Sequence, residues 1–392
     1  MGELRERTLK SIKEKRKKIL EGGINSIPSP FKRFTPYFVG IEQATYYLIT
    51  AYSNGGKSQF TCFYFIFEPL MYLYDNRDKL GNYKYTVLAF PLEETPERIM
   101  QRFMSYLLFK LSNGEYVYSP AELRSSNNDK PLPQKVIDIL ESKEYLDRID
   151  YFEENVKFYQ DLNPTGIYKE VKKYMEERGT TYYKEIEVEN EVGEKTTRKL
   201  FDYYKPNNPD EYVITFIDHI SIIDLERGYT LKQSIDKASE YCSKLLRNRY
   251  GVSPVIVQQQ GTSNESLDAF KQAKTAPSRD NLSDSKYTYK DASIMLSLYN
   301  PSSHELTSYS GYDLTVFKDN IRFLSIKKNR DGEVDKTCPL LFFGTSSHFE
   351  ELPKPDNTKE MDVILKKLTS FRDVIKNKQI TNLTDLIKEE NG

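Results

Sequence analysis

Short apolar runs alternate along the chain with longer stretches whose apolar residues recur at helical spacing. Near-continuous apolar runs are typical of strands in parallel sheets, because these strands are covered on both faces. The predicted strands cover residues 46–50, 85–90, 156–159, 212–217, 253–257, 292–299 and 321–326. Helices are predicted between them, after Ser58, from Thr95, and over residues 164–178 and 231–250. Strands that alternate with helices predict an α/β domain with a mainly parallel central sheet flanked by helices.

The N-terminal residues predict a separate, charged helix. Over residues 3–21 the apolar positions form one narrow stripe, made of Leu9, Ile12, Ile19 and Leu20. Such a helix either frays at the end of the chain or docks on a neighbouring subunit. The chain is accordingly divided into a linker helix (1–23), a connector (24–45), a core domain (46–353) and a C-terminal helical tail (354–392).

Three polar segments interrupt the core domain. Residues 180–211 alternate charged residues with β-formers, which predicts an exposed β-hairpin insertion. Residues 261–290 are rich in Ser, Asp, Asn and Lys and predict a mobile loop. Loops and short helices are expected over residues 113–150.

Composition narrows the class of protein. The 392 residues hold 57 Lys and Arg against 58 Asp and Glu, which excludes a strongly basic coat protein and a dominant acidic tail. A local basic lining would still suffice for nucleic acid. The three Cys and three His show no metal-ligand spacing, so neither a disulfide framework nor a zinc site is expected. No apolar run reaches about 18 residues and the N-terminus is charged, which predicts a cytoplasmic protein without a membrane span.

The strongest local motif is Ala51-Tyr-Ser-Asn-Gly-Gly-Lys-Ser58, between a predicted strand and a predicted helix. It matches the phosphate-binding pattern G-x-x-x-x-G-K-[ST] except that Ala51 replaces the first glycine. Lys57 would reach the β- and γ-phosphates and Ser58 would bind Mg²⁺. The residues expected to contact the nucleotide are Ser53, Asn54, Gly55, Gly56, Lys57, Ser58 and Gln59. The alternative is an ordinary glycine turn.

Polar residues follow three other predicted strands, where ligands gather in open α/β sheets. Asp218 ends the strand at 212–217 and suits a Mg²⁺-binding Walker B aspartate, with a helix cap as the alternative. Glu93 could activate the attacking water, but Glu94 competes with it, and both also suit the start of the next helix. Gln260 could sense the γ-phosphate, although three consecutive glutamines leave the choice open on chemistry alone.

A basic pair follows the strand at 321–326. Lys328 and Arg330 alternate, so both side chains could face one ligand, such as the nucleotide of a neighbouring subunit. The alternative is a solvated basic turn.

The order of these motifs resembles the C-terminal ATPase domain of DnaB, the bacterial replicative helicase family within the RecA-like ATPases, from about residue 8 to about residue 352. Phe90-Pro-Leu-Glu-Glu94 is similar to the family's F-S-L-E-M and selects Glu93 as the catalytic glutamate. Phe216-Ile-Asp-His-Ile220 resembles its Walker B motif. Pro254-Val-Ile-Val-Gln-Gln-Gln260 is similar to P-V-I-A-L-S-Q and selects Gln260. Lys328-Asn-Arg330-Asp-Gly332 resembles K-x-R-x-G, whose Lys and Arg reach the adjacent subunit's γ-phosphate.

The resemblance implies a RecA-like core that binds ATP and Mg²⁺, assembles as a homohexamer and translocates on single-stranded DNA. A primase or a loader would be further partners. The residues expected at the DNA are Lys271, Lys274, Arg279, Lys286 and Lys290, with Tyr287 or Tyr289 stacking on bases. The alternative for these residues is an ordinary flexible loop.

Several features depart from the family pattern. Ala51 replaces a glycine, Ser283 replaces an arginine in the segment resembling the DNA side, and the hairpin at 180–211 is additional. Only about 50 residues precede the phosphate-binding motif, so the family's N-terminal helical domain is not expected within this sequence. A short, Tyr- and Lys-rich chain of this kind favours a phage-encoded enzyme. Two other functions stay open: a RecA-like DNA-dependent ATPase without unwinding, such as a recombination mediator or regulatory switch, and a catalytically degenerate structural or loading protein.

Overall fold

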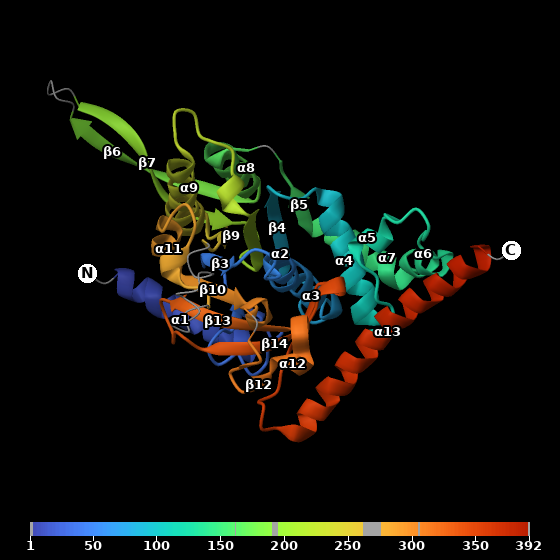
Figure 1. Ribbon diagram of the computed structural model, residues 1–392. Helices are drawn as coiled ribbons and strands as arrows, with labels where there is room; N and C mark the ends of the chain where they lie inside the picture. Colours follow the sequence, from blue (N-terminus) through green and yellow to red (C-terminus); the bar gives the residue numbers. More distant parts are fainter. Residues whose placement is uncertain (1–2, 161, 190–194, 262–275, 305, 391–392) are drawn as a thin grey trace.

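The protein is described by a computed structural model covering residues 3–160, 162–189, 195–261, 276–304 and 306–390 (Figure 1). A nine-stranded sheet forms its centre. In spatial order its strands are β15 (His348–Glu351), β14 (Thr337–Phe343), β13 (Ile321–Asn329), β10 (Ile294–Tyr299), β3 (Tyr47–Ala51), β9 (Ser253–Gln259), β8 (Glu211–Asp218), β4 (Lys84–Pro91) and β5 (Val156–Phe158). The six strands from β10 to β5 pair in parallel, whereas β13, β14 and β15 add antiparallel pairs on one side. The predicted α/β class with a mainly parallel, helix-flanked sheet is therefore confirmed.

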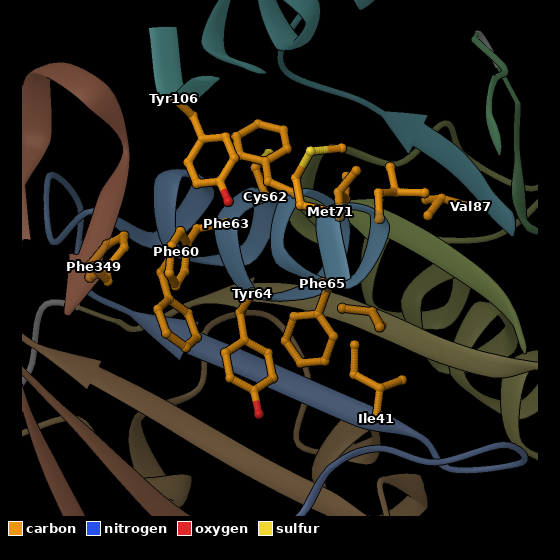
Figure 2. Packing of buried hydrophobic residues seen from close by; sticks show 14 of the residues in the cluster. Ile41, Phe60, Cys62, Phe63, Tyr64, Phe65, Met71, Val87, Tyr106 and Phe349 are labelled. Atoms are coloured by element: carbon orange, nitrogen blue, oxygen red, sulfur yellow. The ribbon is translucent and has the colours of Figure 1, made fainter. Parts of the chain in front are cut away.

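Helices cover both faces of this sheet. One face carries α2 (Lys57–Cys62), a π-helical turn η1 (Phe63–Phe67), α3 (Glu68–Asp75), α4 (Pro96–Leu111) and α7 (Lys143–Asn155), and the other carries α8 (Pro164–Glu177), α9 (Leu231–Glu240) and η3 (Tyr241–Tyr250). Successive strand residues point to opposite faces, so Ile49 belongs to the first core cluster and Leu48 to the second. Figure 2 shows Phe60 of α2 and Phe63 and Phe65 of η1 packed in the first cluster.

Shorter elements join these layers. They are β1 (Ile27–Pro28), β2 (Gly40–Ile41), α5 (Pro120–Leu123), α6 (Gln134–Leu140), η2 (Ile220–Ile222), η5 (Arg279–Asn281), α11 (Tyr287–Asp291), η6 (Pro301–His304), β11 (Ser308–Tyr309), β12 (Tyr312–Asp313), α12 (Leu314–Phe317), η7 (Lys318–Asn320) and η8 (Gly344–Ser346). The segment 261–290 was expected to be loop, but within it the described residues 276–290 hold η5 and most of α11. The connector at 24–45 packs into the core, because Phe31, Phe34 and Phe38 are buried in the first cluster.

The predicted hairpin is confirmed as β6 (Gly179–Glu189) paired with β7 (Lys195–Pro206), which projects away from the sheet (Figure 1). Its base is held to the body, since the Tyr204 hydroxyl donates to the Met175 carbonyl of α8 at 2.7 Å. The ring of Phe201 also lies against Tyr250 of η3.

The two terminal helices differ in their packing. In α1 (Glu3–Leu20) the predicted apolar stripe is exposed, with Ile12 at 58% and Leu20 at 68% of full exposure. In α13 (Thr358–Glu390), by contrast, Leu368 and Phe371 are buried against the strands. Across the described residues, no helix combines the length and apolar character that crossing a membrane requires.

Candidate functional site

Residues 52–56 form the loop that joins β3 to α2 at the carboxyl edge of the parallel strands. Its left-handed residues are Asn54, with φ of 57°, and Gly56, with φ of 86°. The left-handed backbone favours glycine at position 56, and a Cβ there would also meet the Phe342 ring at a tight 3.3 Å. Ala51, which replaces the first glycine of the motif, is the last residue of β3 and does not have a positive φ. The departure from the motif therefore falls where a side chain fits.

The other predicted contact residues of the loop divide into two groups. Ser53, Asn54 and Gly55 line a hollow of about 330 Å³. Gln59 instead donates from its Nε2 to the Gly344 carbonyl at 2.9 Å, which ties the start of α2 to η8.

Lys57, at the first turn of α2, lies beside Asp218 at the end of β8. Both side chains are buried, at 9% and 8% exposure. Burial raises the pKa of Asp218 to about 6, against the opposing effects of the Lys57 ammonium and the Ser58 hydroxyl. Burial likewise lowers the pKa of Lys57, while Asp218 and Glu93 act in the opposite direction. The start of α2 and the end of β8, far apart in the sequence, thus place opposite charges at one buried position.

Two adjacent glutamates follow β4 and have different surroundings. The Glu94 carboxylate accepts a hydrogen bond from Arg102 at 2.5 Å and is largely buried. The Glu93 carboxylate is 56% exposed and lies 3.8 Å from Nε2 of His219. Burial, followed by the Lys57 charge, lowers the pKa of His219 and favours its neutral form. Glu93 is therefore the carboxylate that remains accessible to solvent beside Lys57.

The three glutamines at the end of β9 point to different places. Gln260 is buried and donates to the Thr50 hydroxyl at 2.8 Å, and Gln258 is also buried. Gln259 points to the other face and donates to the Ser53 hydroxyl of the loop at 2.5 Å. Gln259 was not singled out from the sequence. Period-two alternation could have separated it from Gln258 and Gln260, but could not show which face carries the loop.

Lys328 and Arg330 lie at the opposite edge of the sheet from this loop. Lys328 is the eighth residue of the nine-residue β13, so it lies within the strand that was expected to end at residue 326. It pairs with Met295 of β10, which is level with Leu48 at the start of β3. Because the loop follows the other end of β3, the two basic residues do not meet the loop of their own chain.

A third cation, Arg247 of η3, lies with this pair. Lys328 and Arg330 both donate to the Lys290 carbonyl, at 3.0 and 3.1 Å, and Arg247 donates to the Asp291 carbonyl at 3.3 Å. Burial lowers the pKa of Lys328 to about 8, and the nearby Arg330 charge acts in the same direction. Burial and the Arg330 charge also lower the pKa of Arg247. No sequence pattern pointed to Arg247, because only the fold brings η3 beside β13.

The structure describes only some of the residues that were predicted to contact DNA. Lys271 and Lys274 lie outside the described residues. Arg279 is exposed and lies 3.5 Å from Asp280, and Lys290 lies over the Tyr287 ring at 4.8 Å. Lys286 and Lys290 border a hollow of about 440 Å³ that is lined by Lys232, Leu282, Asp284, Ser285, Lys286, Tyr287 and Lys290. Tyr289 is instead covered by the Lys328 ammonium, 4.7 Å from its ring centre.

The residues around Asp218 fit a Mg²⁺ ion carried by a nucleotide. Asp218 Oδ1 is buried without a hydrogen-bond partner, which is costly unless a ligand supplies one. The described residues contain no group of three or more His, Cys, Asp or Glu side chains arranged to hold a metal. Mg²⁺ commonly binds through one or two protein oxygens together with phosphates and water. The Asp218 carboxylate and the Ser58 hydroxyl could supply these protein oxygens.

Comparison with solved structures identifies the fold. The ATPase domain of G40P matches with a TM-score of 0.57 and 17% identity, over 90% of this chain and 100% of that one. A DnaB-like replicative helicase, studied for its interactions with primase, matches with a TM-score of 0.56 and 17% identity, over 85% of this chain and 64% of that one. The chain has the fold of a DnaB-type helicase ATPase domain. No protein-family model and no curated protein matches the sequence.

At 17% identity, the likeness to these two domains establishes the fold alone. The specific roles of the residues described above rest on their own geometry and chemistry.

Proposed function

We propose that the protein is an ATP-dependent replicative DNA helicase. It would assemble as a ring, with six subunits expected, and hydrolyse ATP at the subunit interfaces while translocating on single-stranded DNA. The observation that carries the proposal is Asp218 Oδ1, buried without a partner beside Lys57 at the mouth of the loop 52–56. A buried acid with an unfilled oxygen next to a phosphate-binding lysine is what a Mg²⁺–nucleotide complex completes.

In this proposal each residue at the carboxyl edge has one task. Backbone N–H groups of the loop and the start of α2 bind phosphate oxygens, and Lys57 neutralises the β- and γ-phosphates. Bound Mg²⁺ would supply charge neutralisation at the phosphates. Glu93 orients and deprotonates the attacking water, since Glu94 is already bonded to Arg102. Gln259 and Gln260 connect the end of β9 to the nucleotide site. Gln259 donates to the Ser53 hydroxyl in the loop, and Gln260 donates to the Thr50 hydroxyl of β3, just before the loop.

Lys328 and Arg330 would act on the nucleotide of the adjacent subunit. Their position at the far edge of the sheet excludes their own loop as a target. Together with Arg247 they form a cluster of three cations, and an anion from a neighbour would relieve their mutual repulsion. The exposed apolar stripe of α1 would dock on a neighbouring subunit and so help to hold the ring.

The hollow beside α11 would contact single-stranded DNA. Lys232, Lys286 and Lys290 provide positive charge around it, and the exposed ring of Tyr287 is available for stacking. A primase or loader as further partner, a cytoplasmic location and a phage source belong to the same proposal. The notable departure is Ser283, which donates to the Gln259 carbonyl at 2.8 Å where the family pattern has an arginine.

The test is ATP hydrolysis by the purified protein with and without single-stranded DNA, with Lys57→Ala as the blank. We expect turnover that DNA stimulates and that the substitution abolishes. A strand-displacement assay on a forked duplex then separates a helicase from a DNA-dependent ATPase that does not unwind. Tight ATP binding without turnover in any condition would contradict the enzyme and favour a degenerate structural or loading protein.

A further inference from the structure

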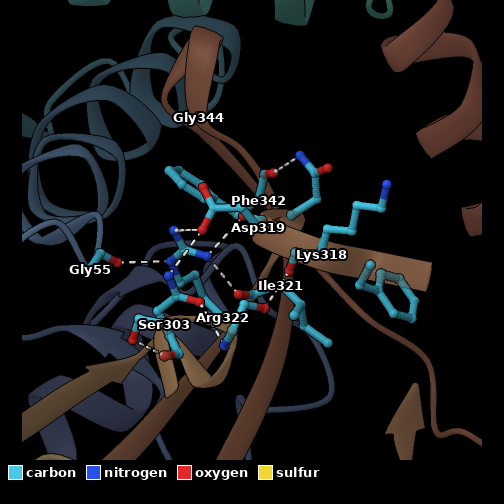
Figure 3. A network of polar contacts seen from close by, with 12 residues as sticks. Gly55, Ser303, Lys318, Asp319, Ile321, Arg322, Phe342 and Gly344 are labelled. Atoms are coloured by element: carbon cyan, nitrogen blue, oxygen red, sulfur yellow. Dashed lines mark hydrogen bonds and ion pairs between the residues drawn. The ribbon is translucent and has the colours of Figure 1, made fainter. Parts of the chain in front are cut away.

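A buried arginine lies against the loop 52–56 and bonds its backbone at Gly55. Arg322 of β13 is 1% exposed and is among the largest fully buried side chains of the described residues. Figure 3 shows its guanidinium lying between Gly55, Asp319 and Phe342. A buried cation is costly unless its donors are bonded, so the set of contacts around it shows what it holds in place.

The guanidinium joins the loop to the neighbouring strands. Its Nε donates to the Gly55 carbonyl at 2.9 Å, and its Nη1 donates to the carbonyls of Asp319 and Ile321 at 2.9 and 2.8 Å. Its Nη2 donates to the Asp319 carboxylate at 3.0 Å. Its Cζ lies 4.5 Å from the centre of the Phe342 ring, which also closes the space beside Gly56.

The bond to Gly55 has a consequence for the loop backbone. In a planar trans peptide the carbonyl oxygen and the following N–H point in opposite directions. Because Arg322 holds the Gly55 carbonyl toward β13, the N–H of Gly56 points away from β13. This N–H belongs to the glycine directly before Lys57, within the group of backbone donors expected to bind phosphate.

We propose that Arg322 is a positioning residue that fixes the Gly55–Gly56 peptide, so that the loop is set for phosphate before a nucleotide arrives. The inference rests on the proposed function, because it assigns to that same site the residue that keeps its backbone donors in place. Arg322 acts through Gly55 and does not touch the nucleotide. An arginine suits this task because its planar fork bonds several carbonyls at once, which a lysine ammonium on a flexible stem does less well.

The test compares Arg322→Met with wild type in the affinity for MgADP, measured by calorimetry. We expect binding about ten- to a hundredfold weaker, since a hydrogen bond from a charged donor is removed. Arg322→Lys should recover part of the affinity. Asp319→Ala removes only the 76% exposed carboxylate, so it should weaken binding by less than about threefold.

Arg148→Met is the matched control for removal of a packed arginine. Arg148 donates to the Asp75 carboxylate and the Glu144 carbonyl and lies over the Tyr74 ring, so it shares a carboxylate, a carbonyl and an aromatic contact with Arg322 but none with the loop. We expect it to lower the melting temperature without changing MgADP affinity. Equal affinity in folded Arg322→Met and wild type would overturn the inference. If Arg322→Met fails to fold, unchanged affinity and exchange in Arg322→Lys would overturn it instead.

Hydrogen exchange of the nucleotide-free protein separates this inference from the proposed function. The amides of Gly55 and Phe60 bond to the carbonyls of Tyr52 and Gly56, at 3.2 and 2.8 Å. We expect both to exchange faster in Arg322→Met and to keep the wild-type rate in Arg148→Met. If wild type binds no MgADP, the proposed function fails while exchange still decides whether Arg322 orders the loop. Unchanged exchange would overturn the inference in that case.

Discussion

The two ends of the parallel strands in the central sheet carry charged groups of opposite sign that the chain itself does not fully pair. At the carboxyl edge, Asp218 is buried with one oxygen lacking a partner, beside Lys57. At the amino edge, Arg247, Lys328 and Arg330 lie together, and burial combined with their mutual repulsion lowers the pKa of Lys328. The first edge is suited to a cation-bearing phosphate, and the second is suited to an anion.

One chain cannot bring these two edges together. The register of β10 and β13 places Lys328 level with the start of β3, whereas the loop follows its end. Two copies arranged head to tail could do so, because a heterologous interface sets one edge of the first copy against the other edge of the second. The contrast between the edges therefore favours a site completed between subunits.

The largest expected effect comes from removing a cation at the amino edge, where Arg247, Lys328 and Arg330 lie. We expect Arg330→Ala to lower ATP turnover about 10³-fold or more, because in the proposed function Arg330 stabilises the transition state at the adjacent subunit. MgADP affinity should stay unchanged, since Arg330 lies far from its own loop. Steady-state hydrolysis and calorimetry measure the two quantities, and Arg198→Ala in the exposed hairpin serves as the control.

Mixing two inactive variants sharpens this prediction. Lys57→Ala removes the phosphate-binding lysine and keeps the basic pair, whereas Arg330→Ala keeps the lysine and removes one of the pair. A random one-to-one mixture should restore about a quarter of the interfaces if the site is shared between neighbours. Turnover that stays at the level of the separate variants would contradict action in trans.

A smaller effect is expected on stability at the carboxyl edge. Since burial raises the pKa of Asp218 from 3.8 to about 6, the folded state binds more protons than the unfolded state between these values. Stability from this group is present below pH 4 and is lost as pH rises through about 6. We expect Asp218→Asn to raise the metal-free stability at pH 7 by about 1–3 kcal/mol while abolishing Mg²⁺-dependent turnover.

Thermal unfolding from pH 4 to pH 7.5 measures the stability effect. The difference between Asp218→Asn and wild type should grow with pH over this range. The exposed Asp224→Asn provides the control for removal of one charge. A variant that is less stable than wild type at pH 7 would show that Asp218 is already well paired, and the contrast between the two edges would then be smaller.

The smallest effect is expected at the hollow beside α11. Neutralising Lys286 or Lys290 should lower the slope of log affinity against log salt for single-stranded DNA by about 0.7 for each phosphate that the variant no longer neutralises. Fluorescence titration at several salt concentrations measures the slope. The exposed Lys359→Ala in α13 is the control, and an equal slope in all variants would remove this surface from the DNA interface.

Local pattern and motif spacing predicted most of the strands that build the carboxyl edge. The runs at 46–50, 85–90 and 212–217 became β3, β4 and β8 within one or two residues at each end. They succeeded because a strand buried on both faces must be apolar throughout. The strand β14 was missed, since Pro339 breaks its pattern and its pairing with β13 is set from outside.

The sequence alone determined the α/β class, the loop between β3 and α2, and the acids that follow the neighbouring strands, because these depend on residues near one another in the chain. The tertiary structure decided the rest. It showed that Gln259 contacts the loop, that Arg247 joins Lys328, and that Arg322 is buried beneath Gly55. Which side chain is buried and which carbonyl it meets depends on distant partners, 267 residues away for Arg322 and Gly55, and no local pattern carries that information.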